Sequence, residues 1–200
     1  AMSKGLLFWR SFTHWVGGMG IIVFVMVFAS LSQDRSIHIL RAEMPGPTVD
    51  KLVPRARDTA RILYLIYIGM TALLAILLLC GGMSLFDSLI HAFGTAGTGG
   101  FGIKADSIAS YSNYCQWVIA IFMFLFGINF NIYYLMVLGR FKSALKSQEM
   151  WMYVGITVVV IGTITTNLMG TFAYTQTFSD ALRIATFQTI AAMTTTGFGV

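Results

Sequence analysis

Charged residues are scarce in this sequence. Lysine, arginine, aspartate and glutamate make up 10% of the 200 residues, whereas 56% are hydrophobic. A soluble domain usually carries about 25% charged residues, so the composition favours a membrane protein. Cysteine is also scarce. Cys80 and Cys115 are the two present, and two isolated thiols in apolar runs are more typical of packing residues than of a disulfide, although a disulfide stays open.

Other chemistries are excluded by what is missing. No cysteine–histidine cluster has metal-site spacing, no HExxH motif occurs, and no pair of aspartates lies within an apolar run. An intramembrane enzyme is therefore not supported, and no cofactor is expected. Proline is confined to the segment EMPGPTVDKLVPR, where its three residues interrupt any helix and mark a boundary between two units.

Long apolar runs are abundant. A bilayer crossing takes about 20 apolar residues, and we predict four spans, none containing a charged residue. Two further apolar stretches, Phe86–Thr98 and Ser179–Thr196, are too short to cross, since a helix of about 13 residues is about 20 Å long. The four predicted spans are His14–Ser32, Ile62–Gly82, Cys115–Gly139 and Trp151–Phe172.

The basic residues predict the orientation of these spans. Residues 33–61 and 140–150 hold nine lysines and arginines, whereas residues 83–114 hold only Lys104 and residues 173–200 only Arg183. Cytoplasmic loops carry the excess of basic residues, so both basic loops are predicted to be cytoplasmic and both short stretches to lie on the outer side. The net charge of +5 is explained by this topology. It does not indicate a nucleic-acid partner, because no basic cluster alternates with stacking aromatics.

An internal repeat is visible at a spacing of 97 residues. Gly100-Phe101-Gly102 matches Gly197-Phe198-Gly199, and Thr98 then falls on Thr195. We therefore predict an all-α membrane fold built from repeated units of helix, half-helix, filter loop and helix. Its parts are the second helix of a preceding unit (1–32), a cytoplasmic linker (33–61), a complete unit (62–139), a cytoplasmic loop (140–150), and the first helix, half-helix and filter of the next unit (151–200).

The two Thr/Gly-rich segments, residues 95–103 and 193–200, are suited to binding a cation through backbone carbonyls. Backbone that is not helical at membrane depth must be buried in protein or line a wet cavity. Its free carbonyls can replace the water shell of a cation, and glycine permits the backbone angles that this requires. With no acidic residue in either segment, neutral oxygens suit a monovalent cation better than Ca²⁺, which takes carboxylate ligands.

The sequence resembles the Trk/Ktr/HKT superfamily of potassium transporters, most closely the bacterial TrkH/TrkG membrane subunits. The stretches that carry the resemblance are FWRSFTHWVGGMGIIVF, RAEMPGP, LIHAFGTAGTGGFG, GINF and FQTIAAMTTTGFG. The resemblance implies four pore units arranged as in a potassium channel, so we expect this chain to be an internal fragment. It also implies that K⁺ is bound by the backbone carbonyls of Thr98, Gly99, Gly100, Phe101, Thr195, Thr196, Gly197 and Phe198.

The resemblance implies further properties of the whole protein. These are potassium uptake across the bacterial inner membrane, a homodimer in lipid, and a cytoplasmic nucleotide-binding regulatory subunit of the TrkA kind, with residues 140–150 as a candidate contact. One alternative is a sodium-permeable or Na⁺-coupled transporter of the same fold, because the first filter, which differs between potassium- and sodium-preferring members, lies outside this sequence. Another is a membrane scaffold that transports nothing, in which the glycine-rich turns merely pack.

Three other features have a packing interpretation. We expect His91 to be a buried packing or hydrogen-bonding residue rather than an ion contact, since a protonated imidazole would repel cations. At least one of Asn129 and Asn131 is expected to hydrogen-bond a neighbouring half-helix. The glycines of WVGGMG are expected to pack against a half-helix of the same subunit rather than to form a dimer interface.

Overall fold

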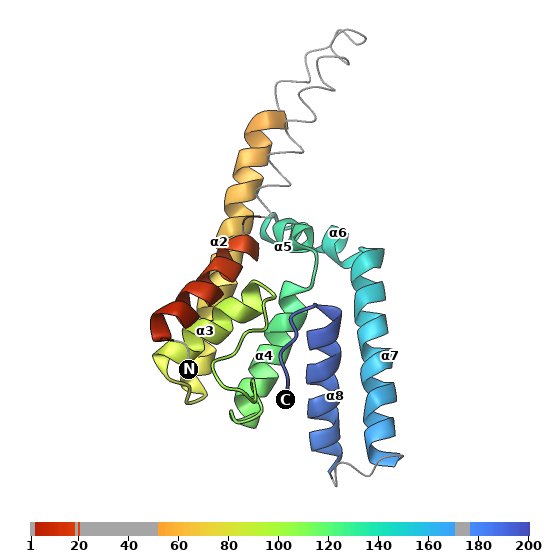
Figure 1. Ribbon diagram of the computed structural model, residues 1–200. Helices are drawn as coiled ribbons and strands as arrows, with labels where there is room; N and C mark the ends of the chain where they lie inside the picture. The colour runs from red at the N-terminus through yellow and green to blue at the C-terminus, as the bar shows by residue number, and fades with distance from the viewer. Residues whose placement is uncertain (1–2, 19, 21–51, 171–176) are drawn as a thin grey trace, which may run out of the picture.

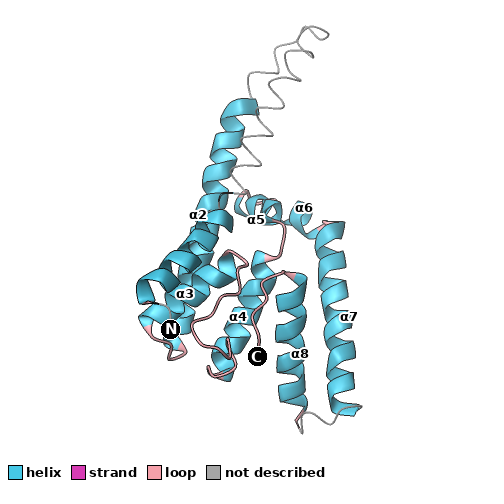
Figure 2. Ribbon diagram, in the orientation of Figure 1, coloured by secondary structure: helices cyan, strands magenta, loops and turns pink. Residues whose placement is uncertain are grey.

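The computed structural model describes residues 3–18, 20, 52–170 and 177–200. In these ranges every regular element is a helix (Figure 2). An N-terminal helix covers residues 4–18. It is followed by α2 (Leu52–Cys80), α3 (Leu85–Ala96), α4 (Asn113–Phe126), α5 (Phe130–Val137), α6 (Phe141–Leu145), α7 (Gln148–Gly170) and α8 (Phe178–Met193).

Within the described ranges, two helices are long and apolar enough to cross a membrane. They are Arg61–Cys80 within α2 and Gln148–Gly170, with mean hydropathies of 2.6 and 1.6. At 1.5 Å per residue, 20 residues span about 30 Å, the thickness of the hydrocarbon core. A core helix of a soluble protein would be mostly buried, yet Leu65 on α2 is 70% exposed and Val159 on α7 is 67% exposed. These apolar faces are suited to lipid.

Two short helices enter the structure from the same end. In Figure 1 the end of α7 and the start of α8 both lie at the lower end of the view, and the chain after α8 returns from the upper end of that helix toward the C-terminal marker. α3 has 12 residues and α8 has 16, so α8 has one extra turn at its start. This turn explains why Asp87 and Asp180, in the first turns of the two helices, match only with a slip when their C-terminal ends are aligned.

The predicted third span, Cys115–Gly139, is wrong as a single helix. α4 ends at Phe126 and α5 begins at Phe130. Two carbonyls at the end of α4 accept hydrogen bonds from tyrosine hydroxyls: Tyr133 Oη lies 2.7 Å from the Leu125 oxygen, and Tyr153 Oη lies 3.3 Å from the Phe124 oxygen. Side chains thus satisfy backbone groups that an uninterrupted helix would pair internally.

Other predicted boundaries shift as well. α2 begins at Leu52, inside the predicted linker 33–61, and contains Pro54, which is tolerated in the first turn of a helix. α6 and the start of α7 lie within the predicted loop 140–150. Most of the predicted span His14–Ser32 and the first part of the linker lie outside the described residues. Cys80 and Cys115 are both free thiols, Cys80 exposed and Cys115 buried.

The core lies between α2, α3, α4 and α8. Its largest fully buried side chains include Tyr67 of α2, Phe187 of α8, and Phe198 of the segment that follows α8. Burying an aromatic or a large aliphatic side chain stabilises a fold by about 1.5–3 kcal/mol. Phe198 therefore anchors the C-terminal segment to the core, while Thr195 and Gly197 of the same segment are exposed.

Candidate ion-filter segments

The segments after α3 and α8 leave their helices in the same way. We name residues 97–102 segment 1 and residues 194–199 segment 2. Gly97 and Thr194 each donate a backbone hydrogen bond four residues back, and Gly100 and Gly197 each donate one six residues back. These two bonds of segment 1 thus have counterparts 97 residues later in segment 2. The acceptors are Phe93 and Gly94 in α3, and Ile190 and Ala191 in α8.

The backbone angles repeat at the same spacing. Thr98 has φ of 51° and Gly100 of 62°, and Thr195 has φ of 56° and Gly197 of 79°. The residues between them, Gly99 and Thr196, are not left-handed. In an extended strand successive carbonyls point to opposite sides, and a left-handed residue at every second position turns them toward a common side. A threonine held in this region is strained, and the structure holds two at matching places.

The two segments meet at Gly100. A Cβ atom on Gly100 would collide with the backbone carbonyl of Thr196, so the backbones of the two segments lie too close for a side chain at position 100. A second contact joins segment 2 to α3, where a Cβ on Gly94 would lie 3.2 Å from the ring of Phe198. Glycine at 94 and 100 therefore allows segments 97 residues apart to lie side by side.

The N-terminal helix supports segment 1 from the other side. A Cβ on Gly97 would lie 2.6 Å from the His14 carbonyl oxygen, and one on Gly99 would lie 3.0 Å from the His14 ring. Arg10 donates a hydrogen bond of 3.0 Å to the Gly102 carbonyl and lies over the Phe101 ring. A Cβ on Gly18 would lie 3.1 Å from the Gly97 Cα, so the packing expected for the glycines of WVGGMG is found at Gly18, whereas a Cβ on Gly17 or Gly20 would meet nothing within 4 Å. The sequence did not predict the contacts of Arg10 and His14 with segment 1, because no pattern distinguishes these two residues from neighbouring packing residues.

His91 is buried behind segment 1. Its Nδ1 lies 2.7 Å from the Asp87 carbonyl oxygen, which can only accept, so Nδ1 carries the proton and donates. The ring packs edge-on against Tyr111 and at 5.8 Å from Phe198. These contacts agree with the packing and hydrogen-bonding role expected from the sequence. The Tyr111 hydroxyl also donates to Asp87 at 3.0 Å, and burial is the main cause that raises the pKa of this phenol.

A polar network joins the loop after segment 1 to α8. The Gln116 amide nitrogen donates to three carbonyls of that loop, those of Ile108, Ala109 and Tyr111. Its amide oxygen accepts from Arg183 of α8, which also pairs with Asp180 at 3.0 Å. From the sequence, Arg183 was used only to assign the outer side of the membrane. Gln116 was not identified there, because a single glutamine in an apolar run has no distinctive pattern.

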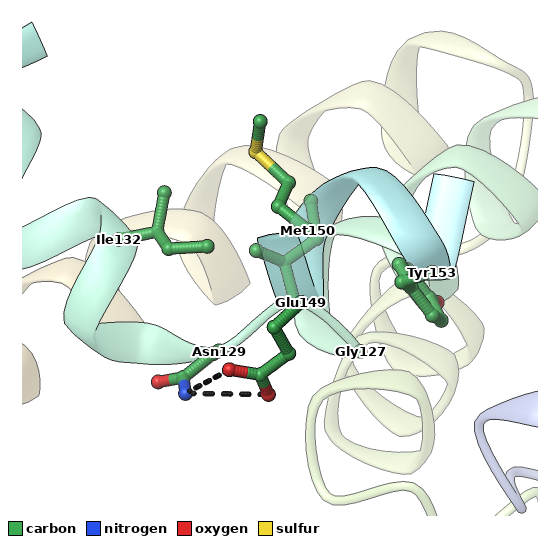
Figure 3. A pocket seen from close by; sticks show the side chains of 7 residues that line it. Gly127, Asn129, Ile132, Glu149, Met150 and Tyr153 are labelled. Atoms are coloured by element: carbon green, nitrogen blue, oxygen red, sulfur yellow. Dashed lines mark hydrogen bonds between the residues drawn. The ribbon is translucent and has the colours of Figure 1, made fainter. Parts of the chain in front are cut away.

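The helix break encloses a small cavity of about 140 Å³ (Figure 3). Across it the Asn129 amide nitrogen donates to the Glu149 carboxylate at 3.1 Å. This bond joins Asn129 to the first turn of α7. The expectation that at least one of Asn129 and Asn131 bonds a half-helix stays a prediction. The cavity lies beside residues of the break and of α7: Gly127, Ile128, Asn129, Ile132, Glu149, Met150 and Tyr153.

Comparison with known proteins decides the family. The family model described as "TrkH: Cation transport protein" matches residues 1–200. The chain belongs to the TrkH family. One relative is the Trk system potassium uptake protein TrkH of Escherichia coli K12, 34% identical over 99% of this chain. Another is TrkI of Halomonas elongata, 30% identical over 98% of this chain.

A solved TrkH structure has the same fold. The crystal structure of the potassium transporter TrkH from Vibrio parahaemolyticus matches with a TM-score of 0.80 and 28% identity over 100% of this chain and 40% of its own. The chain spans about two fifths of the length of the curated TrkH relatives, 41% for that of E. coli K12. The family assignment made from the sequence motifs is therefore confirmed, and so is an all-helical architecture in the described ranges.

The predicted site residues fall into the two segments. Gly100, Thr196 and Gly197 lie at the point where the segments meet, and Phe198 is buried against Gly94. Phe101 differs from its counterpart Phe198, being 42% exposed where Phe198 is 2% exposed. Their role in holding K⁺ stays a prediction. Among the described residues no group of histidine, cysteine, aspartate and glutamate is arranged to hold a metal ion.

Proposed function

We propose that this TrkH-family chain is part of a potassium uptake protein of the bacterial inner membrane, and that segments 1 and 2 are two walls of its ion path. The relatives described above are named potassium uptake proteins. The observation that carries the proposal is the matched geometry of the two segments, with left-handed residues at positions 98 and 100 and again at 195 and 197. The carbonyls proposed to bind K⁺ are those of Thr98, Gly99, Gly100, Phe101, Thr195, Thr196, Gly197 and Phe198.

The chemistry of the segments supports a monovalent cation. A row of backbone carbonyls on one side of a strand can replace the hydration shell of K⁺. α3 and α8 end where the segments begin, so the partial negative charge at each helix C-terminus falls on the ion path. Neither segment contains an acidic side chain, which would be the expected ligand for a divalent ion.

The rest of the protein is proposed to complete the pore. Two further walls come from units outside this chain, and the whole protein is a homodimer with a cytoplasmic nucleotide-binding regulatory subunit. The face proposed for that subunit carries α6, with Arg140 and Lys142 exposed beside the exposed ring of Phe141. This basic, partly apolar end of the molecule is the predicted cytoplasmic side, to which basic residues are biased.

An uptake experiment distinguishes an ion transporter from a membrane scaffold that transports nothing. Full-length protein is produced in cells without other potassium uptake, and radioactive Rb⁺ uptake is measured for wild type, Gly197→Ser and Gly82→Ser. Gly82 is a matched control because it is also left-handed, with φ of 88°, and a Cβ on either glycine would meet nothing within 4 Å. Each substitution carries a similar backbone strain of about 1–2 kcal/mol.

We expect Gly197→Ser to lower Rb⁺ uptake by about tenfold, the effect of a strain near 1.4 kcal/mol placed on the ion path, and Gly82→Ser to leave it near wild type. Uptake by Gly197→Ser equal to that of wild type at equal membrane levels would contradict the proposal. Uptake by all three proteins no higher than in cells without the protein would favour the scaffold. Parallel measurement of Na⁺ uptake tests the sodium-permeable alternative, which predicts that wild type carries Na⁺ at a rate comparable to Rb⁺.

A further inference from the structure

The backbone of Gly199, at the end of segment 2, is hydrogen-bonded to the loop that follows segment 1. The backbone N–H of Gly199 donates to the Ser107 hydroxyl at 3.1 Å, and its carbonyl accepts from the Ile108 N–H, also at 3.1 Å. Both backbone groups of one residue at the end of segment 2 are therefore bonded to two consecutive residues of the other unit.

The anchoring loop is itself fixed. Ile108 is completely buried, and its carbonyl accepts from the buried Gln116 side chain, which Arg183 of α8 holds in turn. Ser107 has φ of 58°, a left-handed conformation unusual for a non-glycine residue. This backbone geometry persists only where the surroundings enforce it, and here it presents the hydroxyl to Gly199.

The two bonds of Gly199 restrict the placement of the neighbouring carbonyls. It directly follows Gly197 and Phe198, whose carbonyls are proposed to bind the ion. Selectivity at a carbonyl-lined site depends on how many carbonyls face the ion and where they lie. A bond that fixes the next residue therefore fixes the placement of those carbonyls relative to segment 1, which belongs to the other unit.

We propose that Ser107 is a positioning residue for ion selectivity, whose hydroxyl holds segment 2 in register with segment 1. It contacts the backbone beside the ion path and not the ion itself. The proposal rests on the proposed function, since it assigns a role within the same ion path. It requires the hydroxyl as an acceptor for Gly199, and not merely the left-handed backbone.

Two substitutions distinguish the effect of the Ser107 hydroxyl from the effect of its left-handed backbone. Ser107→Ala removes the hydroxyl and keeps a Cβ in the strained conformation, whereas Ser107→Gly removes both the hydroxyl and the strain. The matched control is Ser110→Ala in the same loop, since the Ser110 hydroxyl accepts from Lys104 at 2.8 Å and is exposed. All variants are made in the full-length protein, and Rb⁺ and Na⁺ uptake are measured at equal protein levels in the membrane.

We expect Ser107→Ala and Ser107→Gly each to lower the ratio of Rb⁺ to Na⁺ uptake by about fivefold, the effect of one lost neutral hydrogen bond, and Ser110→Ala to keep the wild-type ratio. A wild-type ratio in either Ser107 variant, or an equal fall in Ser110→Ala, overturns the proposal. Gly197→Ser in the same assay keeps the two claims apart. If it lowers uptake while the Ser107 variants keep the ratio, only the role of Ser107 fails.

Discussion

The break between α4 and α5 predicts a measurable coupling between Gly127 and Tyr153. A Cβ on Gly127 would lie 2.5 Å from the Tyr153 hydroxyl and 2.9 Å from the Thr194 methyl group. Carbon atoms and their neighbours prefer separations of about 3.5 Å or more, so in Gly127→Ala the hydroxyl must move by about 1 Å. That movement breaks its 3.3 Å bond to the Phe124 carbonyl.

The magnitudes follow from these contacts. Forcing an extra methyl group into a packed site costs about 1–3 kcal/mol. Because Gly127 has φ of −76° and ψ of −14°, which alanine adopts without strain, the substitution also stabilises by about 0.4–1 kcal/mol through the unfolded chain. The net loss expected for Gly127→Ala is therefore about 1–2 kcal/mol. Tyr153→Phe alone loses one hydrogen bond, about 1 kcal/mol.

The double variant distinguishes a steric clash from an independent effect. In Gly127→Ala with Tyr153→Phe the hydroxyl that clashes is absent, so the two losses are expected to be less than additive by about 1 kcal/mol. The assay is unfolding of the full-length protein in detergent, followed for wild type, both single variants and the double variant. Gly155→Ala in α7 is the control, because a Cβ there meets nothing within 4 Å and alanine is the better helix former.

Two results would refute this reasoning. Additive losses would show that the Tyr153 hydroxyl is not the group that excludes a side chain at position 127. A Gly127→Ala protein as stable as Gly155→Ala would show that the site has room, and that the break does not bring α4 against α7 and the end of α8 as described.

Two further predictions concern the surroundings of the segments. Arg10→Gln loses both the bond to the Gly102 carbonyl and the contact with the Phe101 ring. We expect Rb⁺ uptake to fall about tenfold at normal membrane levels, which corresponds to about 1.5 kcal/mol, the lower end for one charge-assisted hydrogen bond; unchanged uptake would show that this support is dispensable. Cys115→Ser replaces a buried thiol, which donates to the Gly81 carbonyl at 3.5 Å, by a more strongly hydrated hydroxyl and is expected to cost about 1 kcal/mol, whereas exposed Cys80→Ser is expected to cost less than about 0.5 kcal/mol; equal effects in unfolding measurements would contradict the burial of Cys115.

Much of the fold follows from local pattern. The lengths of the apolar runs predicted α2 and α7, and the two shorter runs predicted α3 and α8, because hydropathy and length are properties of each run alone. The motif spacing of 97 residues placed Thr98 on Thr195 and Gly100 on Gly197, and the backbone angles and hydrogen bonds of the structure repeat at that same spacing.

The features that the sequence missed depend on partners distant in the chain. The run from Cys115 to Gly139 contains no charged residue that would mark an end of a span. At its break a carbonyl of α4 accepts from Tyr153, which comes from another helix. Arg10, Ser107 and Gln116 act through hydrogen bonds to backbone atoms. Such bonds need only one polar side chain each and leave no periodic signal, so they emerge once tertiary contacts are known.

The central claim is that segments 1 and 2 border one cation path, and anomalous scattering from Rb⁺ tests it most directly. Crystals of the full-length protein are grown or soaked in Rb⁺, and the anomalous difference density is located relative to residues 98–101 and 195–198. The account predicts density within coordination distance of the carbonyls of both segments. Ordered Rb⁺ density elsewhere in the membrane region, with none between the two segments, would contradict it.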